Sequence, residues 1–274
     1  MKRILTAVVV LPFLIASILI SYLWWVFVLL AAAAIILGLW EFYLLARRLK
    51  LKPDLTAGFL AGAALVTIAV QKDPATTLVF SQFVIVLVTA GTLIAATLRR
   101  TGFDQMIAAA GATLLGVLYV PFLGSHLISI RTSFDPTLSA HLLSYFFLVL
   151  MGGDAGAYYT GRAIGKRKLA PSISPGKTWE GAVGGILAAL GMAVLAHFWF
   201  FRELPLKFSL PLAGIMTVVG IFGDLAESAL KRGAGAKDAA NILPGHGGIL
   251  DRLDSLLFNA PLLYYFASFY FKSG

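Results

Sequence analysis

Residues 228–254 combine basic, acidic and glycine residues in a pattern that suits phosphate and metal chemistry. The segment reads SALKRGAGAKDAANILPGHGGILDRLD. Lysine and arginine neutralise phosphate charge, and aspartate binds divalent cations. Charged residues make up only 13% of the chain, so their concentration here indicates a site. The candidate residues are Ser228, Lys231, Arg232, Lys237, Asp238, His246, Gly247, Gly248, Asp251, Arg252 and Asp254.

Two pairs of carboxylates in or near this segment repeat one spacing. Asp224 and Glu227 are three residues apart near the end of one predicted helix, and Asp251 and Asp254 are three apart at the start of the next. Such pairs share a helix face and can hold one hard cation or flank two. Without cysteine, the ligand types favour Mg²⁺ over zinc. Singly, Asp251 is also explained by the helix dipole, and Glu227 as a partner of Lys231.

The PGHGGILD turn at 244–251 offers successive backbone N–H groups at a predicted helix start. Such groups bind phosphate, and glycine allows a close backbone approach. His246 alone is better explained as a solvated loop residue. Beside Gly247, Gly248 and two acids, we interpret it as a phosphate or nucleotide contact.

A second cluster, KLAPSISPGKTWEG at 168–181, precedes another apolar run. Ser174, Lys177 and Thr178 are residue types that contact phosphate, and we expect Ser174, Pro175 and Gly176 to form a turn. The glycine pattern of a Walker A loop is missing. A purely topological role for Lys177 explains the cluster almost as well.

Asp154 lies inside a predicted membrane span, eight residues before Arg162 and therefore roughly 12 Å from the helix end. The small residues around it are explained by helix packing, but the acid is not. Because carboxylates are costly in a membrane, we expect Asp154 to face a polar cavity or a cation.

The composition places these groups in an all-α polytopic membrane protein. The chain has 274 residues, of which 59% are hydrophobic. Nine apolar runs approach the roughly 20 residues that a spanning helix needs. They cover 4–22, 24–45, 55–70, 76–98, 104–127, 141–162, 180–201, 208–229 and 250–271, the third being the weakest. We expect a single transmembrane domain over 1–274, with scaffold and a lipid cavity in 1–135 and the catalytic part in 140–274.

Most of the 22 lysines and arginines fall on one side of this topology, together with the amino terminus. The positive-inside rule puts that side in the cytoplasm. We therefore expect an inner-membrane protein whose polar pocket opens to the cytoplasm. This bias also explains the net charge of +9, along with attraction to anionic membrane lipids, so nucleic acid is not expected as a partner.

The motif closely resembles the signature of the phosphatidate cytidylyltransferase (CDP-diacylglycerol synthase) family. That signature reads S-x-hydrophobic-K-R, four residues, K-D, and then P-x-H-G-G-x-x-D-R-x-D, which 228–254 match at every fixed position. S-P-x-K-T-x-E-G at 174–181 and G-D-x-x-x-S at 223–228 also resemble the family. Gly176 departs from the basic residue that many relatives carry there.

This resemblance implies the reaction of CTP with phosphatidate to give CDP-diacylglycerol and pyrophosphate, with Mg²⁺ as cofactor and room for a second cation. As catalytic residues we assign Asp154, Asp224, Lys231, Asp251 and Asp254, with Asp224, Asp251 and Asp254 as metal ligands. The other candidates would bind substrate, and a homodimer is left open. A CTP-dependent polyprenol or dolichol kinase and an ion-coupled transporter stay as alternatives, and so does a cytidylyltransferase of archaeal lipids.

Overall fold

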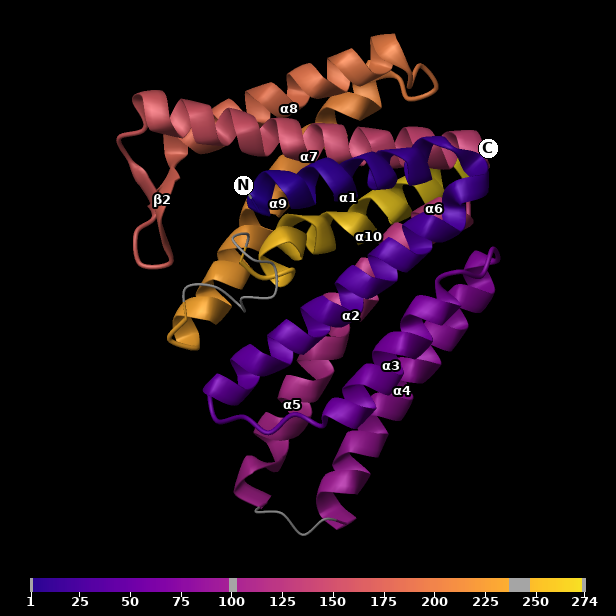
Figure 1. The fold of residues 1–274 in the computed structure, drawn as a ribbon, viewed down its shortest axis with the longest axis vertical. Helices are drawn as coiled ribbons and strands as arrows, with labels where there is room; N and C mark the ends of the chain where they lie inside the picture. The colour runs from indigo at the N-terminus through magenta and orange to yellow at the C-terminus, as the bar shows by residue number, and fades with distance from the viewer. Residues whose placement is uncertain (1, 99–102, 237–246, 273–274) are drawn as a thin grey trace. The chain divides into compact units, whose positions relative to one another are not determined.

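The computed structural model describes residues 2–98, 103–236 and 247–272, and helices dominate this part of the chain (Figure 1). The long elements are α1 (Lys2–Leu19), α2 (Trp24–Arg48), α3 (Leu55–Ile68), α4 (Pro74–Leu98), α5 (Met106–Val117), α6 (Leu123–Thr132), α7 (Pro136–Ile164), α8 (Trp179–Trp199), α9 (Leu206–Gly233) and α10 (Leu250–Lys272). A π-helical turn at Leu118–Phe122 joins α5 to α6. It contains Pro121, which has no N–H group to continue the α-helical ladder.

Helices occupy all nine predicted ranges, and among the described residues six are long and apolar enough to cross a membrane. These six are Ser21–Arg48, Ala75–Leu98, Met106–Thr132, Pro136–Ile164, Trp179–Trp199 and Leu206–Gly233. α3 has only 14 residues, or about 21 Å of helix, which is less than the roughly 30 Å of a bilayer core. The helical membrane architecture is confirmed, and the count of nine spans stays a prediction.

One short β-hairpin is an exception to the all-α prediction. β1 (Lys168–Ala170) pairs in antiparallel fashion with β2 (Ser174–Thr178). The expected turn at Ser174, Pro175 and Gly176 is therefore wrong, because these residues belong to β2. The chain turns just before them, where the Ile173 N–H donates to the Ala170 carbonyl at 3.2 Å.

The chain divides into two compact units. The first comprises Met1–Ser139 and Leu230–Leu253, and the second comprises Ala140–Ala229 and Asp254–Gly274. In the first unit, α2 contacts α1, α3, α5 and α6, and α3 contacts α4. Tyr43 of α2 is fully buried and donates to the Thr113 carbonyl of α5 at 3.0 Å. Gly58 and Gly116 leave room for its ring, since an added Cβ at either would lie within 2.5 Å of Tyr43.

In the second unit, α8 runs alongside α7, and the β-hairpin lies at the end where they connect (Figure 1). A Cβ at Gly156 of α7 would lie 2.3 Å from the Cβ of Ala188, and one at Gly184 of α8 would lie 2.2 Å from the Thr160 hydroxyl. The small residues of α7 thus serve helix packing, as the sequence indicated. Asp154 is exposed on the same helix and does not belong to that packed face.

Candidate functional site

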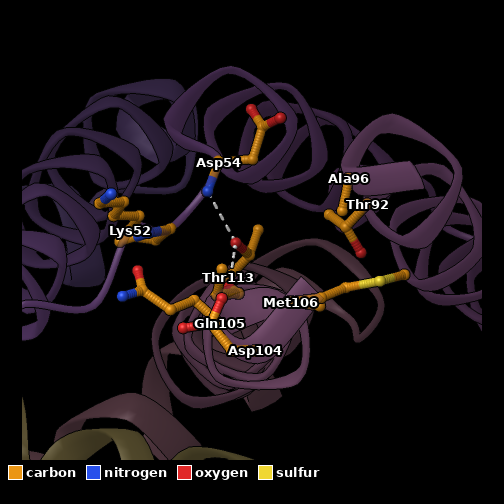
Figure 2. A pocket seen from close by; sticks show the side chains of 11 residues that line it. Lys52, Asp54, Thr92, Ala96, Asp104, Gln105, Met106 and Thr113 are labelled. Atoms are coloured by element: carbon orange, nitrogen blue, oxygen red, sulfur yellow. Dashed lines mark hydrogen bonds between the residues drawn. The ribbon is translucent and has the colours of Figure 1, made fainter. Parts of the chain in front are cut away.

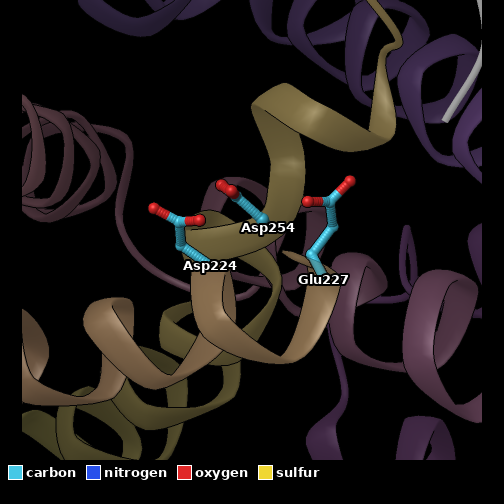
Figure 3. Close-up of side chains that lie close together, drawn as sticks. All are labelled: Asp224, Glu227 and Asp254. Atoms are coloured by element: carbon cyan, nitrogen blue, oxygen red, sulfur yellow. The ribbon is translucent and has the colours of Figure 1, made fainter. Parts of the chain in front are cut away.

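Three carboxylates converge within the second unit. Asp224 and Glu227 lie on α9 and Asp254 on α10, and one oxygen from each lies within 4.8 Å of the others (Figure 3). Gly223 allows this approach, because an added Cβ there would lie 2.7 Å from the backbone oxygen of Asp254. The i, i+3 spacing on α9 and one glycine therefore assemble the group.

Lys177 brings a positive charge to these acids. Its ammonium lies 2.7 Å from Asp224 Oδ2, and it also donates to the Ile221 carbonyl at 3.5 Å. The Ser228 hydroxyl donates to Asp224 Oδ1 at 3.2 Å. Asp154 interacts electrostatically with Asp224 and Lys177, and Asp254 interacts with all three. We call Asp154, Lys177, Asp224, Glu227 and Asp254 the carboxylate cluster.

The hairpin before α8 fixes Lys177 through local contacts. The Trp179 N–H donates to the Arg167 carbonyl at 3.0 Å, and the Glu180 carboxylate accepts the N–H groups of Lys166 and Arg167. The Thr178 hydroxyl accepts the Gly181 N–H at 3.1 Å and so caps α8. The structure thus assigns buried Thr178 to helix capping and gives its predicted phosphate contact no support.

Within the first unit, the turn that precedes α10 is held by carboxylates. Asp251 forms an ion pair with Lys231 through Oδ1, and its Oδ2 accepts the Gly248 N–H at 2.7 Å. Glu41 of α2 accepts the Ile249 N–H at 2.9 Å and the Leu250 N–H at 2.7 Å. These N–H groups were predicted to bind phosphate. In the structure the N–H groups of Gly248, Ile249 and Leu250 donate to the chain's own acids, and the phosphate contact of the turn stays a prediction.

Of the remaining predicted site residues, the structure describes Ser174, Arg232, Gly247 and Arg252. Ser174 is half-buried in β2, and Arg232 and Arg252 are exposed at the ends of α9 and α10. Gly247 has a φ of 80°, a backbone conformation that favours glycine. Three predicted substrate contacts, Lys237, Asp238 and His246, lie outside the described residues.

The three-carboxylate group of Asp224, Glu227 and Asp254 differs from the predicted metal set in one member. Glu227, not Asp251, joins Asp224 and Asp254, and Glu227 is fully buried instead of lying on the surface. In the sequence, the three-residue spacing of Glu227 from Asp224 was the signal that pointed to its membership of this group. Glu41 was missed altogether, although a lone glutamate in an apolar span is a recognised signal for function. Asp251 as a metal ligand stays a prediction.

The donor set of the three-carboxylate group fits Mg²⁺. All three ligand groups are carboxylates, the hard oxygen donors that Mg²⁺ prefers. The 4.8 Å limit on their separations is somewhat above the roughly 4.2 Å between opposite oxygens of a Mg²⁺ octahedron, so a small side-chain adjustment would bring the three to one cation. Lys177 and Ser228 already hold the two oxygens of Asp224, so that carboxylate is oriented before any cation binds.

A separate cavity of about 500 Å³ lies in the first unit (Figure 2). None of the predicted site residues lines it. Its wall contains Lys52, Asp54, Asp104 and Gln105, and the Asp54 N–H donates to Thr113 Oγ1 at 2.8 Å. Pro53, Met106 and Ala109 also line it, so the wall is mixed, and the lipid cavity expected in 1–135 stays a prediction.

Comparisons with known proteins agree with the chemistry of these groups. The chain is 43% identical over 139 residues to the phosphatidate cytidylyltransferase of Haemophilus influenzae, covering 49% of this chain and 48% of that protein. It is 43% identical over 166 residues to that of Bacillus subtilis, covering 60% and 58%. For Staphylococcus haemolyticus the values are 47% over 123 residues, 45% and 47%. The chain thus spans about half the length of the curated relatives it matches.

A sequence model of the cytidylyltransferase family matches residues 1–270, nearly the whole chain. The match includes both compact units and every candidate residue named above. The chain therefore belongs to the cytidylyltransferase family.

Proposed function

We propose that the chain transfers the cytidylyl group of CTP to phosphatidate, giving CDP-diacylglycerol and pyrophosphate for phospholipid synthesis. The observation that carries the proposal is the carboxylate cluster, in which Lys177 lies 2.7 Å from Asp224, beside Glu227 and Asp254. Its relatives named phosphatidate cytidylyltransferase supply the substrate pair.

The reaction is a phosphoryl-type displacement at the α-phosphorus of CTP. A phosphate oxygen of phosphatidate forms the new P–O bond, and the bond to the bridging oxygen of pyrophosphate breaks. The attacking oxygen is already ionised near neutral pH, so the reaction needs no general base. The main obstacle is repulsion between two anions, which positioned opposite charges relieve.

The site residues that the structure describes have distinct roles in this scheme. Asp224 and Asp254, with Glu227, would hold Mg²⁺, and Asp251 stays a predicted further ligand. The bound cation would neutralise charge on the triphosphate. Lys177 orients Asp224 through their ion pair and contributes a positive charge beside the other acids of the cluster. The motif residues Lys231 and Arg232 contact phosphate oxygens, and Asp154 lines the polar site.

We also propose that this chemistry takes place at the cytoplasmic face of the inner membrane, with the amino terminus on the same side. Support comes from the apolar helices and from the bias of basic residues toward that side. CTP then arrives from the cytoplasm, and phosphatidate arrives from the bilayer.

Product identification tests the reaction directly. Purified protein is incubated with CTP labelled at the α-phosphate, phosphatidate and Mg²⁺. We expect the label to appear in a lipid product that comigrates with CDP-diacylglycerol. One pyrophosphate should be released for each molecule of that lipid. With a polyprenol added as acceptor, release of labelled CDP and formation of an unlabelled polyprenyl phosphate would show a kinase instead. Absence of turnover, together with ion flux in vesicles, would support the transporter.

Removal of divalent cations should stop the reaction. With EDTA in excess over Mg²⁺, we expect turnover to fall below about 1% of the starting rate, because a metal contributes several kcal/mol to such a step. Restoring Mg²⁺ should restore the rate, while Ca²⁺, which tolerates looser geometry, should restore less. Full turnover in EDTA would exclude the metal from the scheme.

A further inference from the structure

Glu41 is a buried acid that the proposed reaction does not use. It lies in α2, within the apolar segment Ser21–Arg48, which is long enough to cross a membrane. Its side chain has no exposed surface. An acid in such a place is costly unless its oxygens are satisfied. Its sequence neighbours, Trp40 and Phe42, offer it no charge. The partners come from the other end of the chain.

Those partners are backbone N–H groups of the motif turn, which we define as residues 247–251. Oε1 accepts the Ile249 N–H at 2.9 Å, and Oε2 accepts the Leu250 N–H at 2.7 Å. Each oxygen thus serves a different donor at the first turn of α10. A carboxylate here also interacts favourably with the positive end of that helix.

Gly248 brings the backbone close enough for this contact. A Cβ at this position would lie 2.5 Å from Glu41 Oε2 and 2.9 Å from Asp251 Oδ2. The glycine therefore lies between the two acids, and neither acid could keep its place beside a larger residue. This requirement is independent of the hydrogen bonds and points to the same arrangement.

The contacts continue from the turn to the charged residues of the motif. Gly248 donates its N–H to Asp251 Oδ2 at 2.7 Å, and Asp251 Oδ1 pairs with the Lys231 ammonium. Both side chains are largely shielded, with 12% of Asp251 and 13% of Lys231 exposed. Glu41 thus fixes the turn, the turn fixes Asp251, and Asp251 fixes Lys231.

We propose that Glu41 is a positioning residue, which holds the motif turn so that Asp251 and Lys231 meet the substrate in a single orientation. Its effect on catalysis rests on the proposed function, whereas its effect on the turn does not. Glu41 itself touches no substrate. A misplacement of about 1 Å at reacting groups can cost a factor of about 10², so the effect should appear in the rate.

Glu41→Gln tests this with little change of shape. One oxygen becomes an NH₂ group, which cannot accept the N–H that faces it. We expect amide hydrogen exchange at Ile249 and Leu250 to quicken by about tenfold or more, as local opening becomes easier. We also expect kcat to fall by about 10- to 100-fold, while KM for CTP changes by less than about threefold.

Asp54→Asn is the matched control. Asp54 also lies in the first unit and caps a helix, since it accepts the Ala57 N–H at 3.1 Å at the start of α3. Asparagine caps helices nearly as well as aspartate. Exchange at the motif turn and kcat should both stay within about twofold of the original values.

Gly248→Ala disrupts the contact between Glu41 and the motif turn by a change in the turn itself, because the added Cβ would lie 2.5 Å from Glu41 Oε2. It should reproduce the faster exchange at Ile249 and Leu250 and the lower kcat. The double variant with Glu41→Gln should be no slower than about twice the worse single variant, because both changes break one contact.

The outcomes separate this proposal from the proposed function. Unchanged exchange in both variants, or normal kcat per folded molecule with only a lower unfolding temperature, would overturn the positioning role. If the original protein transfers no cytidylyl group, the proposed function fails, but quicker exchange in Glu41→Gln would still establish the contact with the turn.

Discussion

Asp224→Asn will lower CTP-dependent turnover by about 10³-fold or more, the largest effect expected from a single substitution in this chain. Asp224 has contacts to Lys177 at 2.7 Å and to Ser228 at 3.2 Å, and it belongs to the three-carboxylate group. Loss of its charge weakens cation binding and removes the ion-pair partner of Lys177. A loss of about 4 kcal/mol in transition-state stabilisation corresponds to that factor.

Initial rates at saturating CTP and phosphatidate, measured over a range of Mg²⁺, check this prediction. If the loss reflects the metal, higher Mg²⁺ should recover part of the rate. Glu203→Gln is the matched control in the same unit, since Glu203 is 56% exposed and pairs only loosely with His141 at 3.4 Å. It should keep normal turnover. An Asp224→Asn rate within tenfold of the original would remove Asp224 from the cation site.

The helices could be predicted because apolar run length is a local property. The run at 141–162 became α7 at Pro136–Ile164, and the run at 180–201 became α8 at Trp179–Trp199. Each helix satisfies its own backbone, so its range depends little on the rest of the chain. The pairing of Asp224 with Glu227 on one face follows from helix geometry in the same way.

The hairpin could not be predicted in this way. Ser174, Pro175 and Gly176 have the composition of a turn, yet they form most of β2. Two sets of contacts override that local preference. Lys168 pairs with Thr178 across the hairpin, and the Glu180 carboxylate accepts the N–H groups of residues 166 and 167. Strand pairing depends on the partner more than on intrinsic preference.

Glu41 shows the same limit over a longer distance. Its partner Ile249 is 208 residues away along the chain, so no periodicity or spacing connects them. The sequence marks Glu41 as unusual by its apolar neighbours, but only the fold names what it binds. The motif turn was thus assigned to an external phosphate, although an internal carboxylate already occupies it.

Asp251→Asn will lower turnover by about 10²-fold or more, and it separates two roles of this residue. Asp251 is the partner of Lys231 in the structure and a predicted metal ligand by sequence. Removing one member of a largely shielded ion pair takes the carboxylate of Asp251 away from Lys231, which is destabilising by up to about 3–5 kcal/mol. Thermal unfolding of the purified, detergent-solubilised protein should therefore shift to lower temperature as well.

Lys231→Met in the Asp251→Asn background supplies the decisive comparison. If the ion pair is the structural role of Asp251, removing both charges should recover most of the lost stability, with a coupling of about 1 kcal/mol or more. Turnover should stay low, since Lys231 is itself expected to contact phosphate. Additive stability losses would contradict the ion-pair role, and near-normal turnover of Asp251→Asn would remove it from the reaction. Recovery of stability without recovery of rate would show that one pair of charges serves both the fold and the chemistry.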